Sequence, residues 1–397
     1  MIPVRRLTVA AAALALSGCG IAAVDYGPVP HAAYVTDPRC APQPGATVDG
    51  DALPLFFATS RLPDCRTPDI SLLRHRGDMI RYGRFAVPTE TEVGGKKKLR
   101  TPMAFQNSAD WWTALQAETD RRQGRVLLYV HGYRETFEST SKDAAQIARM
   151  TGFDGPVIEY SWPSQGEVLS YAVDETNMYH DVRNFRDFLK TLAERPWVKE
   201  IVVVSHSLGA RLVIPAIAYV DRASSSADSS NISNVILASP DIDRETFERD
   251  IEEEVLSARR VANDRRITVY VSHADKALAA SRALHGYPRL GSPYCFDPFE
   301  AADLKAKGLP VRCYPVARAG LTVVDTTDVS RSATGHSNFL RSAVACRDFV
   351  DVVAGKRTRP ERMATLLAHT FRLVPDPADP KPDDEAICNR LPVTAAP

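Results

Sequence analysis

Residues 201–209, with the sequence IVVVSHSLG, constrain the fold of this chain more than any other segment. The first four are β-branched and apolar, as in a short buried strand, and the apolar spacing of residues 210–220 predicts a helix. Ser207 lies between them among small residues, with Ser205 before it and Gly209 after it. A strand, a tight turn and a helix in this order can expose a nucleophilic serine at the turn. We therefore predict that Ser207 is a catalytic nucleophile; the alternative is a serine that only caps the helix.

A nucleophilic serine needs a general base and a carboxylate that orients the base. In hydrolases with this kind of turn, the acid and then the histidine follow the serine along the chain. We predict His336 as the base, because it lies in a loop after the last expected strand, at the carboxyl edge of the sheet. Two other histidines are poorer candidates, because His285 ends a helical segment and His369 is expected within a helix.

Three aspartates compete for the role of orienting acid. Asp275 follows the expected strand 267–271, whereas Asp241 and Asp243 follow the strand before it. The acid follows the penultimate strand in most hydrolases of this kind, which favours Asp275. A minority place it one strand earlier, so Asp241 is the alternative acid and Asp243 comes third. Both of these could instead cap the helix that begins at residue 244.

The oxyanion that forms during acyl transfer needs two backbone N–H donors. One should be Leu208, directly after the nucleophile and at the start of a helix, whose dipole also favours negative charge. The other should come from the loop after an earlier buried strand, with Tyr133 as the first candidate and Arg134 as the second. Gly132 lets this loop turn close to the substrate, and His131 is expected to brace it.

Strand and helix patterns alternate along most of the chain. Short apolar runs predict strands at residues 55–59, 83–87, 126–130, 157–162, 201–204, 234–238, 267–271 and 321–324. Helical spacing predicts helices at residues 138–150, 178–193, 210–220, 244–258 and 338–353. This alternation implies an α/β fold with a mainly parallel sheet of about eight strands and helices on both faces. We assign residues 53–373 to one domain, followed by an irregular tail at 374–397.

The N-terminus carries signals for export. Two arginines precede an apolar stretch that is too short to span a bilayer. The residues LSGC, ending at Cys19, resemble the bacterial lipobox, which implies that a signal peptide, residues 1–18, is removed and Cys19 is acylated. Gly20 in place of Asp favours the outer membrane, with the protein facing the periplasm, and residues 19–52 are expected to form a tether. An ordinary secretory signal with an incidental cysteine is the alternative.

Six cysteines remain after Cys19, and an even number in an exported chain indicates disulfides. Pairing of sequence neighbours gives Cys40–Cys65, Cys295–Cys313 and Cys346–Cys388. Six cysteines allow 15 pairings, and free buried thiols are the alternative. None of the spacings is typical of a structural zinc site, so we expect no metal.

Charge gives no indication of a polyanionic partner. The chain has 49 Lys and Arg against 49 Asp and Glu, and loss of the two signal-peptide arginines leaves 47 against 49. We therefore expect no nucleic-acid binding. The chemistry predicted for Ser207 needs no cofactor, and the sequence does not indicate the oligomeric state.

Several patches together resemble a bacterial α/β-hydrolase family of unknown function, within the esterase/lipase superfamily. They are YVHGY at 129–133, SWPS at 161–164, SHSLG at 205–209, SPDID at 239–243 and GHS at 335–337, with FATSR at 57–61 and YGRF at 82–85. The resemblance covers about residues 53–355. It implies the α/β-hydrolase fold and a triad of Ser207, Asp275 and His336, but no known substrate.

One segment departs from that family. The segment 287–320, between the predicted acid and the predicted base, is longer than we expect for the family, and it contains Cys295 and Cys313. A disulfide that closes a loop of this size stabilises by about 3 kcal/mol. We therefore expect a disulfide-stapled lid or pocket wall near the mouth of the active site.

Together these features predict a lipid-anchored serine hydrolase, most simply a carboxylesterase that acts on a small-molecule or lipid ester through an acyl-enzyme. Two other functions are open. The first is a lipid-anchored binding module that has kept the fold without turnover. The second is amide hydrolysis or acyl transfer on envelope lipids or polymers by the same triad.

Overall fold

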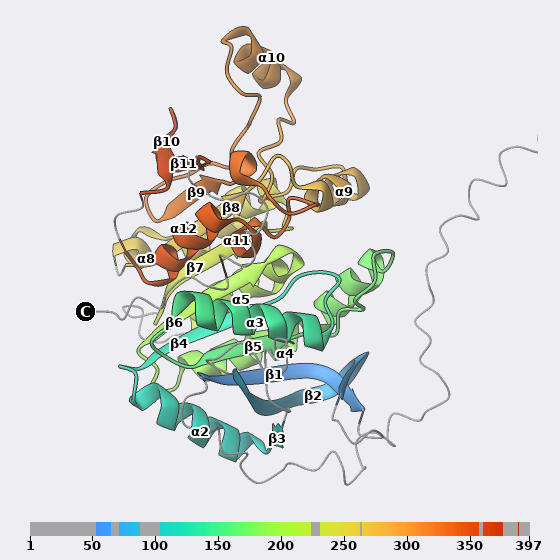
Figure 1. Ribbon diagram of the computed structural model, residues 1–397, viewed down its shortest axis with the longest axis vertical. Coiled ribbons are helices and arrows are strands. Elements are labelled where there is room, and N and C mark those ends of the chain that lie inside the picture. The colour runs from blue at the N-terminus through green and yellow to red at the C-terminus, as the bar shows by residue number, and fades with distance from the viewer. Residues whose placement is uncertain are drawn as a thin grey trace, which may run out of the picture.

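The structure is a computed structural model that describes residues 53–64, 71–87, 104–223, 231–262, 264–356, 360–375 and Cys388. The described residues form one sheet of eleven strands in the order β10-β11-β9-β8-β7-β6-β4-β5-β1-β2-β3 (Figure 1). The strands are β1 (Leu53–Asp64), β2 (Ser71–Val87), β3 (Ala104–Gln106), β4 (Arg125–Val130), β5 (Val157–Ser161), β6 (Glu200–His206), β7 (Ile232–Ala238), β8 (Arg266–Val271), β9 (Leu321–Asp325), β10 (Arg362–Ala364) and β11 (Thr370–Leu373).

The sheet is mainly parallel, as the sequence predicts. Parallel pairing runs without interruption from β1 through β5, β4, β6, β7, β8 and β9 to β11. The pairs β1–β2, β2–β3 and β10–β11, at the two ends of the sheet, are antiparallel. The sheet has three strands more than the eight that were predicted. These are β3, β10 and β11, which have only three or four residues and are too short to show a hydrophobic pattern.

Helices cover both faces of the sheet (Figure 1). One face packs against α2 (Ser108–Asp120), α4 (Tyr171–Ala193) and α5 (Ala210–Ala223), and the other against α3 (Phe137–Thr151), α11 (Asn338–Arg341) and α12 (Ala343–Val353). Strand β4 shows the reason. Val126, Leu128 and Val130 belong to the first core, whereas Leu127 and Tyr129 belong to the second, since side chains alternate along a strand.

The predicted helix at residues 244–258 is interrupted in the structure. Its place is taken by α6 (Arg244–Thr246), a π-helical turn (Phe247–Ile251), α7 (Glu252–Val255) and α8 (Ala258–Ala262). Phe247, the first residue of the wider π turn, and Val255, the last residue of α7, are both fully buried. Apolar spacing alone does not distinguish this arrangement from one continuous helix.

The register of the sheet brings two loops together. Val130 in β4 lies opposite Ser205 in β6, so the chain leaves both strands at the same edge, side by side. One loop contains Tyr133 and Arg134, and the other contains Ser207. This edge, formed by the carboxyl ends of the parallel strands, is called the carboxyl edge below.

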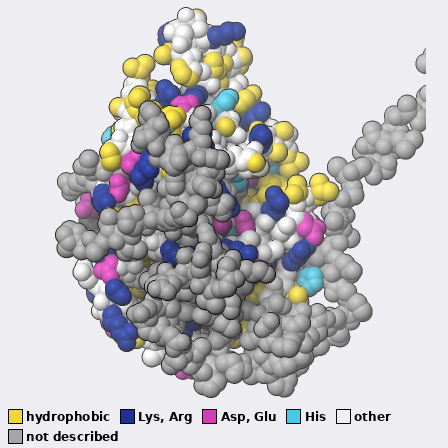
Figure 2. All heavy atoms as spheres, viewed as in Figure 1, with side chains coloured by type: hydrophobic (Ala, Val, Ile, Leu, Met, Phe, Trp, Pro, Cys, Tyr) yellow, Lys and Arg dark blue, Asp and Glu magenta, His cyan; other side chains and the backbone are white. Residues whose placement is uncertain are grey.

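An inserted segment between α9 (Lys276–His285) and β9 projects from the body (Figure 1). It carries α10 (Pro298–Ala306), which has no buried residue. Phe299 is 83% exposed, and Figure 2 shows apolar atoms on this projection. The disulfide Cys295–Cys313 closes its base, and Arg312 pairs with Asp325 and Asp328 of the body. We call residues 295–313 the arm.

A second predicted disulfide, Cys346–Cys388, is also present. Cys40–Cys65, the signal peptide, Cys19, the tether and nearly all of the tail lie outside the described residues. Within the described ranges, no helix is both long and apolar enough to cross a bilayer.

Candidate active site

Ser207 occupies a strained turn between β6 and α5. Its φ is +52°, in the left-handed region that residues with a side chain rarely adopt. The surroundings require small residues, because a Cβ at Gly209 would lie 2.5 Å from the carbonyl oxygen of His131. A Cβ at Gly132 would lie 2.6 Å from Ser207 Cβ, so the loop after β4 rests directly against Ser207.

His336 and Asp275 form a close, buried pair. His336 Nδ1 donates to Asp275 Oδ2 at 2.7 Å, and the two side chains are 13% and 0% exposed. The other carboxylate oxygen of Asp275 accepts from Leu278 N at 2.9 Å, capping α9. The ring of His206, the residue before Ser207, lies 4.7 Å from the ring of His336. Among the described residues, no hydrogen bond joins Ser207 to His336.

Charges around His336 favour its protonated form. Burial alone would lower the pKa of His336, but the charge and the hydrogen bond of Asp275 raise it. Asp241 and Glu135 add to this effect, and the pKa of His336 is raised above 6.5 overall. The site therefore stabilises an imidazolium at position 336.

The other two aspartates point to different partners. Asp241 lies near the site, since its backbone N donates to Ser207 O at 3.0 Å. Its carboxylate accepts from Tyr171 at 2.6 Å and from Ser281 at 2.7 Å, and it pairs with two arginines, Arg211 and Arg289. Asp243 accepts from the N of Thr246 at 2.8 Å and caps α6. Of the three aspartates, only Asp275 bonds to His336.

Three further histidines lie in surroundings that explain them without a catalytic role. His285 Nε2 lies 3.1 Å from Glu175, and His131 is fully buried and stacks on Trp162. Burial and the charge of Arg61 lower the pKa of His131 to about 3, so it is neutral. The prediction that His369 lies within a helix is wrong, because His369 precedes β11 in a turn with a φ of +55°. The apolar residues before it belong to that turn.

The loop after β4 distinguishes the two candidates for the second oxyanion donor. The N–H of Arg134 donates to Asp174 Oδ2 at 3.0 Å, so it is already occupied. The N–H of Tyr133 donates to no group in the described part of the chain. Leu208 lies in the first turn of the helix after Ser207, where N–H groups have no partner within the helix.

Sequence reasoning missed Arg61 and Asp174 near this loop. Both are fully buried, and each hydrogen-bonds to the loops after β4 and β5. An arginine near the end of a strand and an aspartate in a helix ordinarily lie in solvent. The only signal was that Arg61 belongs to FATSR, one of the patches that resemble the family.

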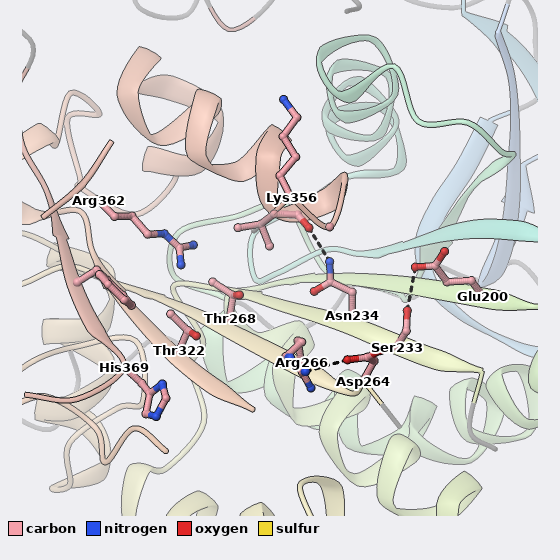
Figure 3. A pocket seen from close by; sticks show the side chains of 13 residues that line it. Glu200, Ser233, Asn234, Asp264, Arg266, Thr268, Thr322, Lys356, Arg362 and His369 are labelled. Carbon is pink, nitrogen blue, oxygen red and sulfur yellow. Dashed lines mark hydrogen bonds and ion pairs between the residues drawn. The ribbon is translucent and has the colours of Figure 1, made fainter. Parts of the chain in front are cut away.

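A cavity of about 650 Å³ lies at the opposite edge of the sheet (Figure 3). Glu200 and Arg266, the first residues of β6 and β8, line it, whereas Ser207 follows the end of β6. Several of its side chains are paired: Ser233 with Glu200, Arg266 with Asp264, and Asn234 with the carbonyl of Val352. In the ranges that the structure describes, no group of His, Cys, Asp or Glu side chains is arranged to hold a metal ion.

A family model described as "Alpha/beta hydrolase of unknown function (DUF900)" matches residues 107–354. No curated protein is significantly similar to the chain.

Several solved esterase structures resemble the chain weakly. The hyperthermophilic esterase from the archaeon Pyrobaculum calidifontis is 11% identical with a TM-score of 0.29, and the match covers 74% of this chain and 78% of that one. The ester-hydrolase EH1AB1 from the metagenome of Lake Arreo is 13% identical with a TM-score of 0.32, covering 82% and 90%. Acyl-protein thioesterase 2 from Zea mays is 13% identical with a TM-score of 0.28, covering 52% and 85%. Likenesses with TM-scores this low say nothing about function.

Proposed function

The chain belongs to the family of α/β hydrolases of unknown function and has the α/β-hydrolase fold, and on that premise we propose that it is a serine hydrolase that cleaves ester bonds. The observation that carries the proposal is the hydrogen-bonded pair of His336 and Asp275, with the ring of His336 4.7 Å from that of His206, the residue directly before a serine with a φ of +52°. In this proposal Ser207 is the nucleophile, His336 the base and Asp275 the orienting acid.

The reaction proceeds in two steps. Ser207 Oγ attacks the ester carbonyl carbon while its proton passes to His336 Nε2, and Asp275 stabilises the resulting imidazolium. The N–H groups of Leu208 and Tyr133 bind the oxyanion. The alcohol leaves with the proton of His336, and an acyl-enzyme remains on Ser207. Water then attacks the acyl-enzyme with His336 as base, releasing the acid and restoring Ser207.

Location narrows the substrate. Acylation of Cys19 and a tether at residues 19–52 would keep the enzyme at the periplasmic face of the outer membrane, as the LSGC sequence favours. We therefore propose that the natural ester is an envelope lipid or a small molecule in the periplasm. No cofactor takes part in the proposed steps.

The test is covalent labelling of the oxidised protein, without its signal peptide, by a fluorophosphonate, together with hydrolysis of short p-nitrophenyl esters. Wild type should label, and Ser207→Ala should lose both labelling and turnover. Ser233→Ala is the matched control, because Ser233 lies at the opposite edge of the sheet and should leave labelling unchanged.

Other outcomes identify the other functions. Folded wild type that does not label overturns the proposal in favour of a non-catalytic binding module. Labelling without ester turnover, combined with cleavage of anilides or acyl transfer to an added alcohol, indicates an amidase or acyltransferase that uses the same serine.

A further inference from the structure

Two sequence patches that the proposed triad does not use meet inside the protein. Arg61, from FATSR at the end of β1, is fully buried. Its guanidinium donates to Ser161 Oγ at 3.0 Å and to Ser164 O at 2.9 Å, both in the SWPS patch, which begins at the last residue of β5. A third donation reaches Glu135 O at 2.8 Å, in the loop after β4. One side chain therefore links both loops.

Asp174, from α4, links the same two loops from the other side. Its buried carboxylate accepts from the N–H of Arg134 at 3.0 Å, from Ser164 Oγ at 2.5 Å and from the N–H of Gln165 at 2.6 Å. Ser164 Oγ in turn accepts from the N–H of Glu135 at 2.9 Å. We call Arg61, Asp174 and Ser164 the clamp.

The clamp fixes the peptide on which Tyr133 lies. On one side of Tyr133, Gly132 rests against Ser207. On the other side, Arg134 has a φ of +65°, a conformation that costs energy in a residue with a side chain. Its N–H is held by Asp174, so the strained conformation persists and the N–H of Tyr133 is left for another acceptor.

Charge explains why the clamp is more than packing. Arg61 is a buried cation among Asp174, Glu159, Glu135 and Asp181, and it stays charged although burial lowers its pKa to about 10. Buried charged groups contribute little net stability, since desolvation offsets their attraction. Three fixed donors facing fixed acceptors supply a defined geometry instead.

We propose that Arg61, Asp174 and Ser164 are positioning residues that hold the N–H of Tyr133 where it binds the oxyanion. They touch no reacting atom and act through the backbone of residues 132–135. The inference rests on the proposed function, because an oxyanion forms only if Ser207 attacks a carbonyl.

The experiment compares Ser164→Ala, Asp174→Asn and Arg61→Lys with wild type. Titration with a fluorophosphonate first measures the concentration of reactive sites. Turnover is then expressed as kcat per reactive site, so that unfolded protein does not lower the value. Ser207 adds to the carbonyl of an alkyl trifluoromethyl ketone, and the tetrahedral adduct carries an oxyanion. The inhibition constant of this ketone therefore reports how well the oxyanion hole binds negative charge. Ser164→Ala removes one small hydroxyl and keeps the test valid if the two charged positions do not tolerate change.

Arg265→Lys is the matched control. Arg265 is also a buried arginine, and it pairs with Asp221 at 2.8 Å. It directly precedes β8, at the opposite edge of the sheet from Ser207. This variant should lower thermal stability and leave kcat per site and ketone affinity unchanged.

In the clamp variants, we expect kcat per site to fall about 10–100-fold and ketone affinity to fall in parallel, with KM within about threefold of wild type. Unchanged kcat per site and ketone affinity in both Ser164→Ala and Asp174→Asn would overturn the inference while leaving the serine hydrolase intact. Wild type that does not label would instead overturn the proposed function, and the inference with it.

Discussion

The two edges of the sheet differ in what they hold. The amino edge contains the cavity of about 650 Å³, which is lined in part by Asp264 and His369, two residues with positive φ. The carboxyl edge holds Ser207 and Arg134, both with positive φ, and the pair of His336 and Asp275. The hydrogen-bonded pair of histidine and aspartate, with a strained serine at the same edge, therefore favours the carboxyl edge as the candidate reactive edge, whereas neither positive φ alone nor the volume of a cavity does so.

The largest expected effect separates the two acids at the carboxyl edge. Asp275→Asn should lower kcat about 10³–10⁴-fold, because an amide favours the wrong tautomer of His336 and cannot stabilise its charged form. Asp241→Asn is the control, and its turnover per labelled site should stay within about tenfold of wild type, because Asp241 bonds Tyr171 and Ser281 instead. Steady-state kinetics with p-nitrophenyl acetate measure both variants. A greater loss in Asp241→Asn would exchange their roles.

A smaller effect compares one glycine from each edge. Gly132→Ala would bring a Cβ to within 2.6 Å of Ser207 Cβ, and displacing the loop that carries Tyr133, the proposed oxyanion donor, should cost about 10²-fold in kcat per site. Gly355 lines the cavity and has a φ of +69°, with open space around its would-be Cβ. Gly355→Ala should cost about 1 kcal/mol of stability through its backbone and leave kcat unchanged. If Gly132→Ala and Gly355→Ala had equal kcat, the proposal that only the carboxyl edge takes part in turnover would be contradicted.

The smallest effect is a shift in pH dependence. In the proposed mechanism His336 is the base and acts only when neutral. Its pKa is raised above 6.5, so kcat/KM should fall as the pH is lowered through that raised pKa. Asp275→Asn removes the main cause of the raised pKa, so the acid limb of the remaining activity should move to lower pH. His369→Asn, at the amino edge, should leave the limb in place. If His369→Asn moved the acid limb, the assignment of His336 as the base would be contradicted.

Local patterns were sufficient to predict most of the fold. Strand β4 is a continuous apolar run because both faces of a parallel strand are buried, and such runs are visible in the sequence. Strands β10 and β11 escaped prediction because strands of three or four residues depend on pairing with a neighbour. The same reason explains why His369 was wrongly predicted to lie within a helix, since the turn that contains it connects β10 to β11.

Contacts between distant segments account for what was missed near the candidate site. The chain order of serine, acid and histidine suggested Ser207, Asp275 and His336 from the sequence alone. Arg61 and Asp174 are 113 positions apart, and only the sheet brings them to the same loops. The sequence already placed Tyr133 before Arg134, and the structure adds a physical reason, because the N–H of Arg134 is bonded to Asp174.

The arm offers an independent consequence. Its two cysteines have Cα atoms 4.8 Å apart, and helix α10 between them has no buried residue. A segment with closely spaced, covalently fixed ends can be exchanged without moving the rest of the chain. The arm is therefore a natural grafting point, where an affinity tag, a fluorescent reporter or a recognition peptide could replace residues 296–311, with Arg312 and its pairs to Asp325 and Asp328 retained, while the domain below keeps its shape.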